Sequence, residues 1–484
     1  MTFVADFEPR PLWAHFDEIL TIPRGSKEED RIREYVVGVA QRNGLEHTVD
    51  DTGNVVVKKP GTPGKENAPA TILQSHLDMV NEKNSDVEHD FSKDAIKPVL
   101  EGEYLTADGT TLGSDNGIGV ASMLAIMEAD DLVHGPLEFL FTIDEETGLT
   151  GAGGLDPALL SAKQLLNLDS EEEGSLTVGC AGGADTELVQ TVEALPAPSK
   201  ATAHKVKLFG MNGGHSGIDI HLQRGNAVQL LGRMIHAITH GTPGFLSEIQ
   251  GGDKHNAIPR EAWATVVIPE DQAGEFLLQL GQLFEALKDE YRAVEPDMDF
   301  KIEEVPLPPQ VWSTDSTWRV LRFLVALPHG VVAMSNDIPG LVETSTNLAA
   351  VKCQGREVKV LMSSRSSVAS ALGWIRRKIR AIGYLAGAEV KEHDGYPGWK
   401  PDLDSQVLQV VKDVHTRVMG AVPHVEAVHA GLECGIIGEM IPGMDMISFG
   451  PQIEYPHSPN ERVKVPSVGR FYDLLTETLK ELAG

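Results

Sequence analysis

The feature that most constrains the fold is a repeated pattern in which an apolar run of strand length is followed, within at most about eight residues, by acidic or imidazole side chains. Runs of this kind span residues 70–73, 137–143, 164–168 and 446–449. Segments with helical periodicity alternate with them, at residues 13–20, 28–42, 113–128 and 406–419. This alternation predicts an α/β fold with a central, mostly parallel sheet that helices cover on both faces.

Polar residues that follow such runs, or that lie where a loop is expected, form five separated patches. They span residues 74–78, 114–117, 144–148, 167–170 and 455–458. Sites in such sheets lie beyond the carboxyl ends of the strands, so we expect the patches to meet at one edge. Two imidazoles and several carboxylates gathered there are a ligand set for a pair of divalent ions, with carboxylate left over for acid/base chemistry.

The sequence pattern changes in the middle part of the chain, which indicates a second domain. A chain of 484 residues is too long for one ordinary core. From about residue 188 to about residue 398 the spacing of carboxylates and histidines is lost, and the earlier alternation then resumes. We therefore predict a catalytic domain in two parts, residues 1–187 and 399–484, with an inserted α+β domain at residues 188–398.

Charge and composition exclude several classes of partner. The 41 basic and 71 acidic residues give a formal charge of −30, which argues against binding nucleic acid or an anionic membrane surface. The first residues lack the basic and apolar regions of a signal peptide, and no apolar run approaches the roughly 18 residues of a membrane span. Three scattered cysteines, Cys180, Cys353 and Cys434, read as reduced thiols. We expect a cytoplasmic protein.

Three side chains stand out in the first two patches. His76 and Asp78 lie two positions apart at a strand end, so both point to the same side; one can bind a metal while the other orients a ligand or a base. Asp115 lies in a glycine-rich segment before a helix, where an N-cap role is the ordinary reading. A phosphate-binding loop would need a lysine that is missing. We favour a carboxylate that bridges two ions, since the ligand count otherwise falls short.

The other patches supply the remaining ligands and a base. Adjacent acids such as Glu145 and Glu146 are most often solvated, but these two follow a buried-strand run. Neighbouring side chains diverge in an extended segment, so one can ligate while the other acts as general base; the residues do not tell which. Asp169 is assigned to a metal and the acids 171–173 to solvent. His457 lies in a proline-flanked loop that suits a fixed ligand.

Together the patches resemble peptidase family M20, and within it the aminoacyl-histidine dipeptidases. The phrases SHLDMV, LGSDNGIG, DEETGLTGA, NLDSEEEG and PHSPNERV carry this resemblance, which extends over essentially the whole chain. It implies two Zn²⁺ ions per chain, with Co²⁺ or Mn²⁺ as substitutes. By resemblance, His76 and Asp169 hold one ion, Glu146 and His457 hold the other, and Asp115 bridges them. Asp78 would orient the His76 imidazole, and Glu145 would be the general base.

The inserted segment then resembles the lid domain of the family. Its length, about twice that of simple lids, implies two lobes. His215 matches a lid histidine that donates a hydrogen bond to the tetrahedral oxyanion. Asn256 and Arg365 match positions that contact the substrate backbone and its free carboxylate, for which an arginine fork is suited. Gly431 matches a loop lining the substrate pocket. Whether His215 serves its own chain or a partner stays open, and so does a homodimer.

The resemblance implies a zinc-dependent dipeptidase that hydrolyses unblocked dipeptides, including Xaa-His substrates of the β-alanyl-histidine type. One rival is a deacylase or carboxypeptidase of the same family acting on N-acylated amino acids. The other rival is a metal-binding scaffold without catalysis. The presence of both Glu145 and His215 disfavours the scaffold.

Overall fold

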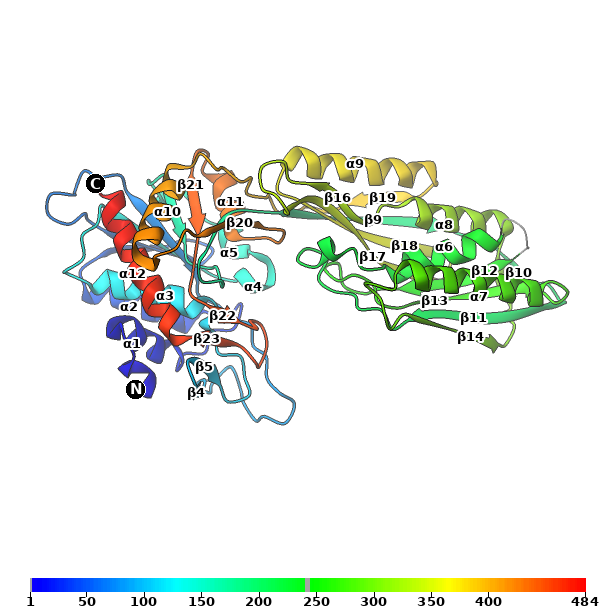
Figure 1. The fold of residues 1–484 in the computed structure, drawn as a ribbon, viewed down its shortest axis with the longest axis horizontal. Coiled ribbons are helices and arrows are strands. Elements are labelled where there is room, and N and C mark those ends of the chain that lie inside the picture. Colours follow the sequence, from blue (N-terminus) through cyan, green and yellow to red (C-terminus); the bar gives the residue numbers. More distant parts are fainter. Residues whose placement is uncertain (1, 240–243) are drawn as a thin grey trace. The chain divides into compact units, whose positions relative to one another are not determined.

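The computed structural model describes residues 2–239 and 244–484, which form two compact units (Figure 1). The first unit comprises the chain up to residue 180 together with residues 399–427 and 432–484. The second unit comprises residues 181–398 and 428–431. The chain therefore leaves the first unit, builds the second, and returns to complete the first.

The first unit is built on a mixed sheet with strand order β1-β2-β6-β3-β7-β21-β8-β20. Its four inner strands β6, β3, β7 and β21 run parallel to one another. Because β3 and β6 lie inside the sheet, every residue of both strands is buried. The strands are β1 (Glu46–Val49), β2 (Val55–Lys59), β3 (Thr71–His76), β6 (Leu137–Thr142), β7 (Gln164–Asn167), β8 (Ser175–Cys180), β20 (His424–Val428) and β21 (Asp445–Ser448).

Helices pack against this sheet. The longest buried one, α3, is covered along nearly its whole length and contacts β3, α1 and α2. Helix α10 begins where Ser405 accepts a hydrogen bond from the Leu408 N–H and ends at the left-handed Gly420. The helices are α1 (Arg10–Ile19), α2 (Asp30–Arg42), α3 (Ser114–Glu128), α4 (Glu145–Gly148), α5 (Thr150–Gly153), α10 (Gln406–Met419), α11 (Glu433–Met440) and α12 (Val465–Leu482), with 3-10 turns at Phe3–Asp6 and Pro157–Leu159.

A small antiparallel sheet, β22-β23-β5-β4, joins segments far apart in the sequence. Its strands are β4 (Pro98–Glu101), β5 (Tyr104–Ala107), β22 (Ile453–Glu454) and β23 (Arg462–Lys464). The pairing of β5 with β23 ties the loop after β22 to the first half of the chain. That loop carries His457.

The second unit is an antiparallel sheet with strand order β14-β11-β13-β12-β17-β18-β9-β19, and β16 pairs with β17. A separate pair, β10 and β15, is also antiparallel. The strands are β9 (Gly182–Thr191), β10 (Ala194–Pro196), β11 (Ala201–Phe209), β12 (Phe245–Gly251), β13 (Ala262–Pro269), β14 (Asp299–Val305), β15 (Gln310–Trp312), β16 (Gly330–Met334), β17 (Val342–Gln354), β18 (Glu357–Ser366) and β19 (Glu389–Glu392). The predicted fold class, a mostly parallel α/β unit with an additional unit of strands and helices, is confirmed.

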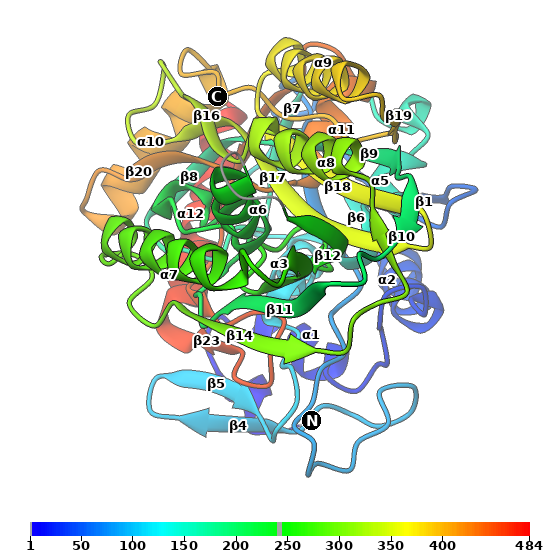
Figure 2. The same cartoon turned by 90° about the vertical axis from the view of Figure 1, so that its right-hand side faces the viewer.

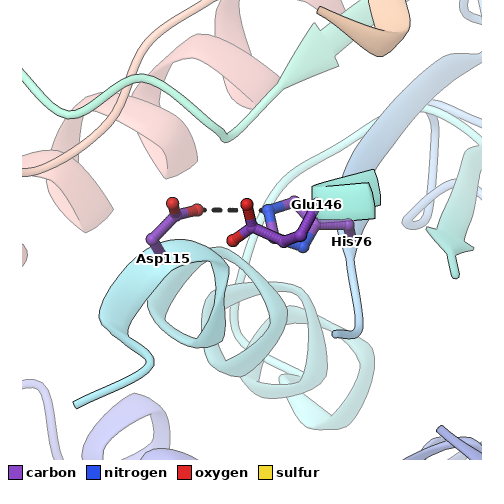
Figure 3. A group of neighbouring side chains, drawn as sticks. All are labelled: His76, Asp115 and Glu146. Atoms are coloured by element: carbon purple, nitrogen blue, oxygen red, sulfur yellow. Dashed lines mark hydrogen bonds and ion pairs between the residues drawn. The ribbon is translucent and has the colours of Figure 1, made fainter. Parts of the chain in front are cut away.

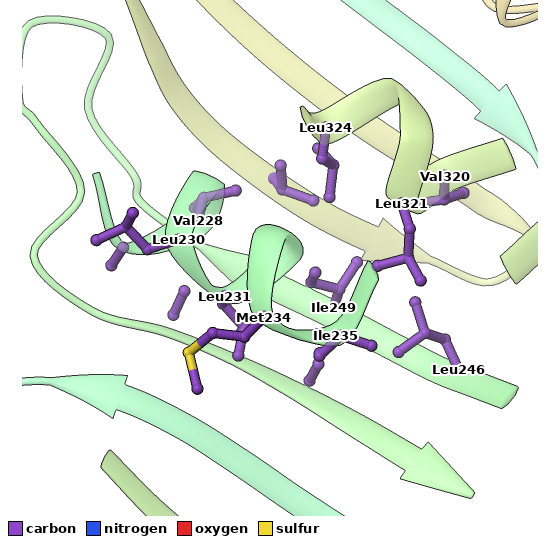
Figure 4. Packing of buried hydrophobic residues seen from close by; sticks show 14 of the residues in the cluster. Val228, Leu230, Leu231, Met234, Ile235, Leu246, Ile249, Val320, Leu321 and Leu324 are labelled. Atoms are coloured by element: carbon purple, nitrogen blue, oxygen red, sulfur yellow. The ribbon is translucent and has the colours of Figure 1, made fainter. Parts of the chain in front are cut away.

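The second unit has its own core between its sheet and its helices. Helix α6 packs against α7 and α8, and all three contact the sheet (Figure 2). Apolar side chains of α6 meet those of β12 and α8 in Figure 4, and each fully buried one contributes about 1.5–3 kcal/mol. The helices are α6 (Ala227–Thr239), α7 (Ala273–Glu290), α8 (Thr314–Ala326) and α9 (Ala369–Leu385), with a 3-10 turn at Ile220–Leu222.

Two further expectations concern the chain as a whole. Within the described ranges no helix has both the length and the apolar character that crossing a bilayer requires. Cys180, Cys353 and Cys434 are all free, as expected, and the first and last of them are buried.

Candidate metal centre and active site

The site begins at the carboxyl ends of three neighbouring parallel strands. Strand β3 pairs with β6 on one side and with β7 on the other, so the residues that follow these strands emerge at the same edge. His76 ends β3, Glu146 lies in the helical turn α4 just after β6, and Asp169 follows β7. Asp115 comes from the start of α3, and His457 comes from the loop before β23. The structure thus brings all five predicted metal ligands together.

These five side chains form two groups that share one carboxylate. The Nε2 atom of His76 lies 3.1 Å from Asp115 Oδ1 and 3.2 Å from Asp169 Oδ1. The Nε2 atom of His457 lies 3.1 Å from Asp115 Oδ2 and 3.0 Å from Glu146 Oε2. Each oxygen of Asp115 therefore faces a different imidazole and a different second carboxylate. This is the arrangement that a bridging ligand between two ions requires.

The donor atoms are spaced as cation ligands should be. Ligand atoms of His76, Asp115 and Glu146 all lie within 4.8 Å of one another, and Figure 3 shows the three side chains pointing together. A tetrahedral zinc with bonds of about 2 Å places its donors a little over 3 Å apart, as observed here. One oxygen of Glu146 is buried without a hydrogen-bond partner in this structure. A buried carboxylate oxygen without a partner costs free energy that a bound cation would offset, so the residues fit a pair of divalent cations.

Without cations, the imidazoles and carboxylates neutralise one another. Hydrogen bonds to Asp115 and Glu146 raise the pKa of His457 to about 11, although its side chain is half exposed. Burial raises the pKa of Asp169 to about 6, against the opposing charge of His76. Metal ligation needs neutral imidazole and ionised carboxylate, so cation binding at this site would release protons.

Asp78 touches His76 from the side opposite the ligand atoms. It is fully buried, and its Oδ1 lies 3.3 Å from His76 Nδ1. The same carboxylate accepts hydrogen bonds from the backbone N–H groups of Glu145 at 3.0 Å and Glu146 at 3.2 Å, and from Ser26 Oγ at 2.7 Å. Burial alone would raise the pKa of Asp78, but the bonds and charge of His76 lower it to about 2. An ionised Asp78 at this distance favours a proton on Nδ1 of His76.

Glu145 and Glu146 are separated by geometry. Glu146 faces His457, as described above, whereas no hydrogen bond or ion pair joins the half-buried Glu145 carboxylate to a predicted ligand among the described residues. Burial, and then the charges of Asp169 and Glu433, hold the pKa of Glu145 well above its usual range, against the opposing charge of His76. Bound dications would oppose this shift. Of the two adjacent glutamates, Glu145 is thus the one that does not pair with a predicted ligand.

The acids after Asp169 are not all solvated as predicted. Glu172 is exposed, and Glu171 is half-buried. The carboxylate of Glu173 receives two hydrogen bonds from the Arg470 guanidinium, at 2.5 and 2.9 Å. The solvent assignment is therefore wrong for Glu173, because α12 places an arginine opposite it. It is also wrong for Glu171, because burial and then the charges of Asp115 and Asp169 raise the pKa of that carboxyl group to about 8.

The other predicted residues belong to the second unit. His215 Nδ1 accepts hydrogen bonds from the backbone N–H groups of Gly217 at 3.2 Å and Ile218 at 3.1 Å. Burial and then the charge of Arg365 lower the pKa of His215 to about 4. The ring is therefore neutral with its proton on Nε2, which makes that nitrogen a hydrogen-bond donor. Together with Asn256, His215 lines a cavity of about 810 Å³.

Arg365 and Gly431 meet at one tyrosine. The buried Arg365 donates from Nη1 to the Tyr396 hydroxyl at 2.9 Å, and its Nε has no partner. A Cβ at Gly431 would lie 2.8 Å from a ring carbon of Tyr396, so only glycine lets the ring sit there. The buried His429 donates to or accepts from Ser345 Oγ at 2.7 Å.

Sequence reasoning missed several residues around these predicted positions. The buried ones are Arg24, Glu433 and Glu461 in the first unit and His429 in the second, and the half-buried Tyr396 also lies in the second unit. Glu433 accepts hydrogen bonds from Gln74 Nε2 at 2.6 Å and Thr142 Oγ1 at 2.7 Å, beneath the ends of β3 and β6. Glu461 lies within the phrase PHSPNERV and His429 lies two residues before Gly431, but nothing in the spacing of single residues indicates their partners.

Comparisons with known proteins find relatives that match nearly the whole chain. The profile of the family described as Peptidase family M20/M25/M40 matches residues 72–481. The cytosol non-specific dipeptidase of Escherichia coli (strain K12) is 40% identical over 482 residues, which cover 100% of this chain and 99% of that protein. A crystal structure of aminoacylhistidine dipeptidase from Vibrio alginolyticus is 42% identical with a TM-score of 0.93, covering 99% of this chain and 98% of that one. The aminopeptidase PepT from Bacillus cereus shares the fold alone, at 18% identity and a TM-score of 0.59 over 99% and 100% of the two chains.

Proposed function

The chain belongs to peptidase family M20/M25/M40, and from this premise we propose that it is a zinc-dependent dipeptidase. Its substrates are unblocked dipeptides, including Xaa-His dipeptides of the β-alanyl-histidine type, and it works in the cytoplasm. The names of the Escherichia coli and Vibrio alginolyticus relatives support the substrate class and the compartment. The observation that carries the proposal is the Asp115 carboxylate, which offers one oxygen to the His76 group and the other to the His457 group.

In this proposal two Zn²⁺ ions are held in the first unit, with Co²⁺ or Mn²⁺ as substitutes. His76 and Asp169 hold one, Glu146 and His457 hold the other, and Asp115 serves both. A pair of such ions, when bound, polarises a carbonyl group and lowers the pKa of water. Asp78 keeps the proton of His76 on Nδ1, so that Nε2 stays available as a ligand atom.

The proton transfers and the substrate contacts fall to the chain's own side chains. Glu145 accepts a proton from the attacking water and passes it to the leaving amine, a role open to it because its carboxylate pairs with none of the predicted ligands. His215 donates from Nε2 to the developing oxyanion. Asn256 and Arg365 bind the substrate backbone and its free carboxylate, and Gly431 lines the pocket beside Tyr396. The second unit acts as the lid, with a homodimer partner or the same chain supplying His215.

The base is tested by Glu145→Ala. We expect the variant to bind two zinc ions with wild-type affinity and to lose hydrolysis of Ala-His by about 10²–10⁴-fold, because a positioned general base contributes about that much. Glu172→Ala removes an exposed acid nearby and is the matched control, with unchanged turnover expected. Zinc content and steady-state rates are measured on the same preparations. Undiminished turnover in Glu145→Ala would refute the assignment.

The substrate class is tested with a panel of compounds. We expect wild-type protein to hydrolyse free Ala-His and β-alanyl-histidine and to leave N-acetylated amino acids intact. Cleavage of the acetylated compounds alone would favour a deacylase or carboxypeptidase. A zinc-loaded protein that cleaves neither class would favour the scaffold.

A further inference from the structure

A buried arginine joins the two loops that carry Asp78 and Asp115. Arg24 lies between α1 and α2 and is only 3% exposed. Its Nη1 donates to the backbone carbonyl oxygens of Leu77 at 3.0 Å and Asp78 at 2.8 Å, and its Nη2 donates to that of Gly113. The loop after β3 and the segment that opens α3 are therefore held by the same planar group.

A buried glutamate holds the same segment by its N–H groups. Glu461 is 2% exposed and lies four residues after His457. Its Oε2 accepts from the backbone of Leu112 at 2.8 Å and Gly113 at 2.9 Å. Its Oε1 accepts from Ser114 N at 2.7 Å, Ser114 Oγ at 2.6 Å and Asp115 N at 3.3 Å. One carboxylate thus satisfies four consecutive backbone donors that end at the shared carboxylate residue.

Two glycines of this segment make room for the arginine. A Cβ at Gly113 would lie 2.4 Å from Arg24 Nη2, and one at Gly117 would lie 2.9 Å from the same nitrogen. Gly113 also has a φ of 73°, in the left-handed region that favours glycine. At the next positions the backbone departs from helix, with φ and ψ of −83° and 114° at Asp115. The segment keeps this shape because Glu461 accepts hydrogen bonds from its backbone N–H groups and Arg24 donates one to the Gly113 carbonyl oxygen.

We propose that Arg24 and Glu461 are positioning residues that set the Asp115 carboxylate between the two imidazoles. This inference rests on the proposed function. Neither side chain makes a hydrogen bond to a ligand atom. Glu461 acts through the backbone of residues 112–115, and Arg24 acts through the backbone of Leu77, Asp78 and Gly113. Glu461 also couples residues 112–115 to the loop that carries His457, because Glu461 and His457 both belong to the stretch of chain that leads into β23. Distortion of the segment would move Asp115 away from one imidazole or both, and so weaken metal binding.

The test is Glu461→Gln with Glu138→Gln as matched control. Glu138 is also buried, and it accepts from the backbone of Ser161 and Ala162 and from Ser161 Oγ, but it lies near the start of β6, at the opposite end of the sheet. In both variants an amide nitrogen replaces one acceptor oxygen and leaves backbone donors unsatisfied. We expect both to lower the melting temperature. Zinc affinity is measured by competition with a chromophoric chelator, and kcat and KM are measured with Ala-His.

We expect Glu461→Gln to weaken zinc binding and to lower kcat by about 10- to 100-fold each, with a smaller change in KM, and Glu138→Gln to leave all three unchanged. Arg24→Lys should also weaken zinc binding and lower kcat, since one ammonium group does not span two loops. If Glu461→Gln does not fold, Arg24→Lys takes its place as the test variant. A loss of melting temperature alone in both site variants would overturn the inference. If wild-type protein binds two zinc ions but cleaves no dipeptide, the proposed function fails, while the zinc measurements still decide the positioning role.

Discussion

The sharpest test of the metal centre is the substitution Asp78→Asn. Asparagine keeps the size of the side chain but has one acceptor oxygen where the carboxylate has two. In the wild type those two oxygens serve His76 Nδ1, two consecutive backbone N–H groups and the Ser26 hydroxyl. If the amide oxygen stays toward His76 and Glu145, its NH₂ group faces Ser26 and the Glu146 N–H. Ser26 can rotate and accept, but the Glu146 N–H is left without a partner.

The contacts set the size of the effect. An unsatisfied buried donor costs about 1–3 kcal/mol, which should appear as lost stability of the metal-free protein. The loss of charge beside His76 acts separately, because a neutral partner makes the imidazole a poorer ligand. Removal of such a partner weakens metal binding by about 10- to 100-fold. We therefore expect a zinc affinity lowered by that factor in addition to a lower melting temperature.

Asp445→Asn is the matched control. Asp445, at the start of β21, likewise accepts from two consecutive backbone N–H groups, those of Gln406 and Val407, and from the Ser405 hydroxyl. It lies at the end of the sheet opposite the site. Both variants should lose stability, as measured by thermal unfolding without metal, but only Asp78→Asn should lose zinc affinity in the chelator competition. Equal zinc affinity in the two variants would refute the role of Asp78 in orienting His76.

Two other predictions concern stability. Burial and then the charge of Arg365 lower the pKa of His429 from 6.5 to about 4, and the neighbouring His215 adds to that effect when charged. Between about pH 6.5 and pH 4 the unfolded state therefore binds more protons than the folded state, so the free energy of unfolding should fall as the pH drops through this range. His429→Gln should reduce that fall by up to about 3 kcal/mol, as measured by denaturant titrations at several pH values. The same pH profile in the variant and the wild type would contradict this prediction. A Cβ at Gly450 would lie 1.7 Å from the Ser170 carbonyl oxygen, so Gly450→Ala should destabilise the protein by about 1–3 kcal/mol or more. Gly153 has open space around it, so Gly153→Ala should not destabilise the protein. Equal melting temperatures of the two variants would count against the close approach at Gly450.

The sequence alone sufficed for the fold class and for the set of polar residues at the sheet edge. The reason is periodicity: apolar runs such as 137–143 mark buried strands, and parallel strands deliver the residues that follow them to one edge. His76, Glu146 and Asp169 could be grouped on this basis, although they are up to about ninety residues apart in the chain.

Only the tertiary structure decided how these residues pair. Adjacent glutamates look alike in a sequence, but the turn after β6 aims Glu146 at His457. Arg24 and Glu461 form no sequence motif with the segment that they hold, because their partners are backbone atoms. Nearly every residue has these backbone groups, so the sequence does not show which of them a side chain binds. What a sequence records is which chemistry is available; which oxygen of Asp115 meets which imidazole depends on packing between segments more than three hundred residues apart.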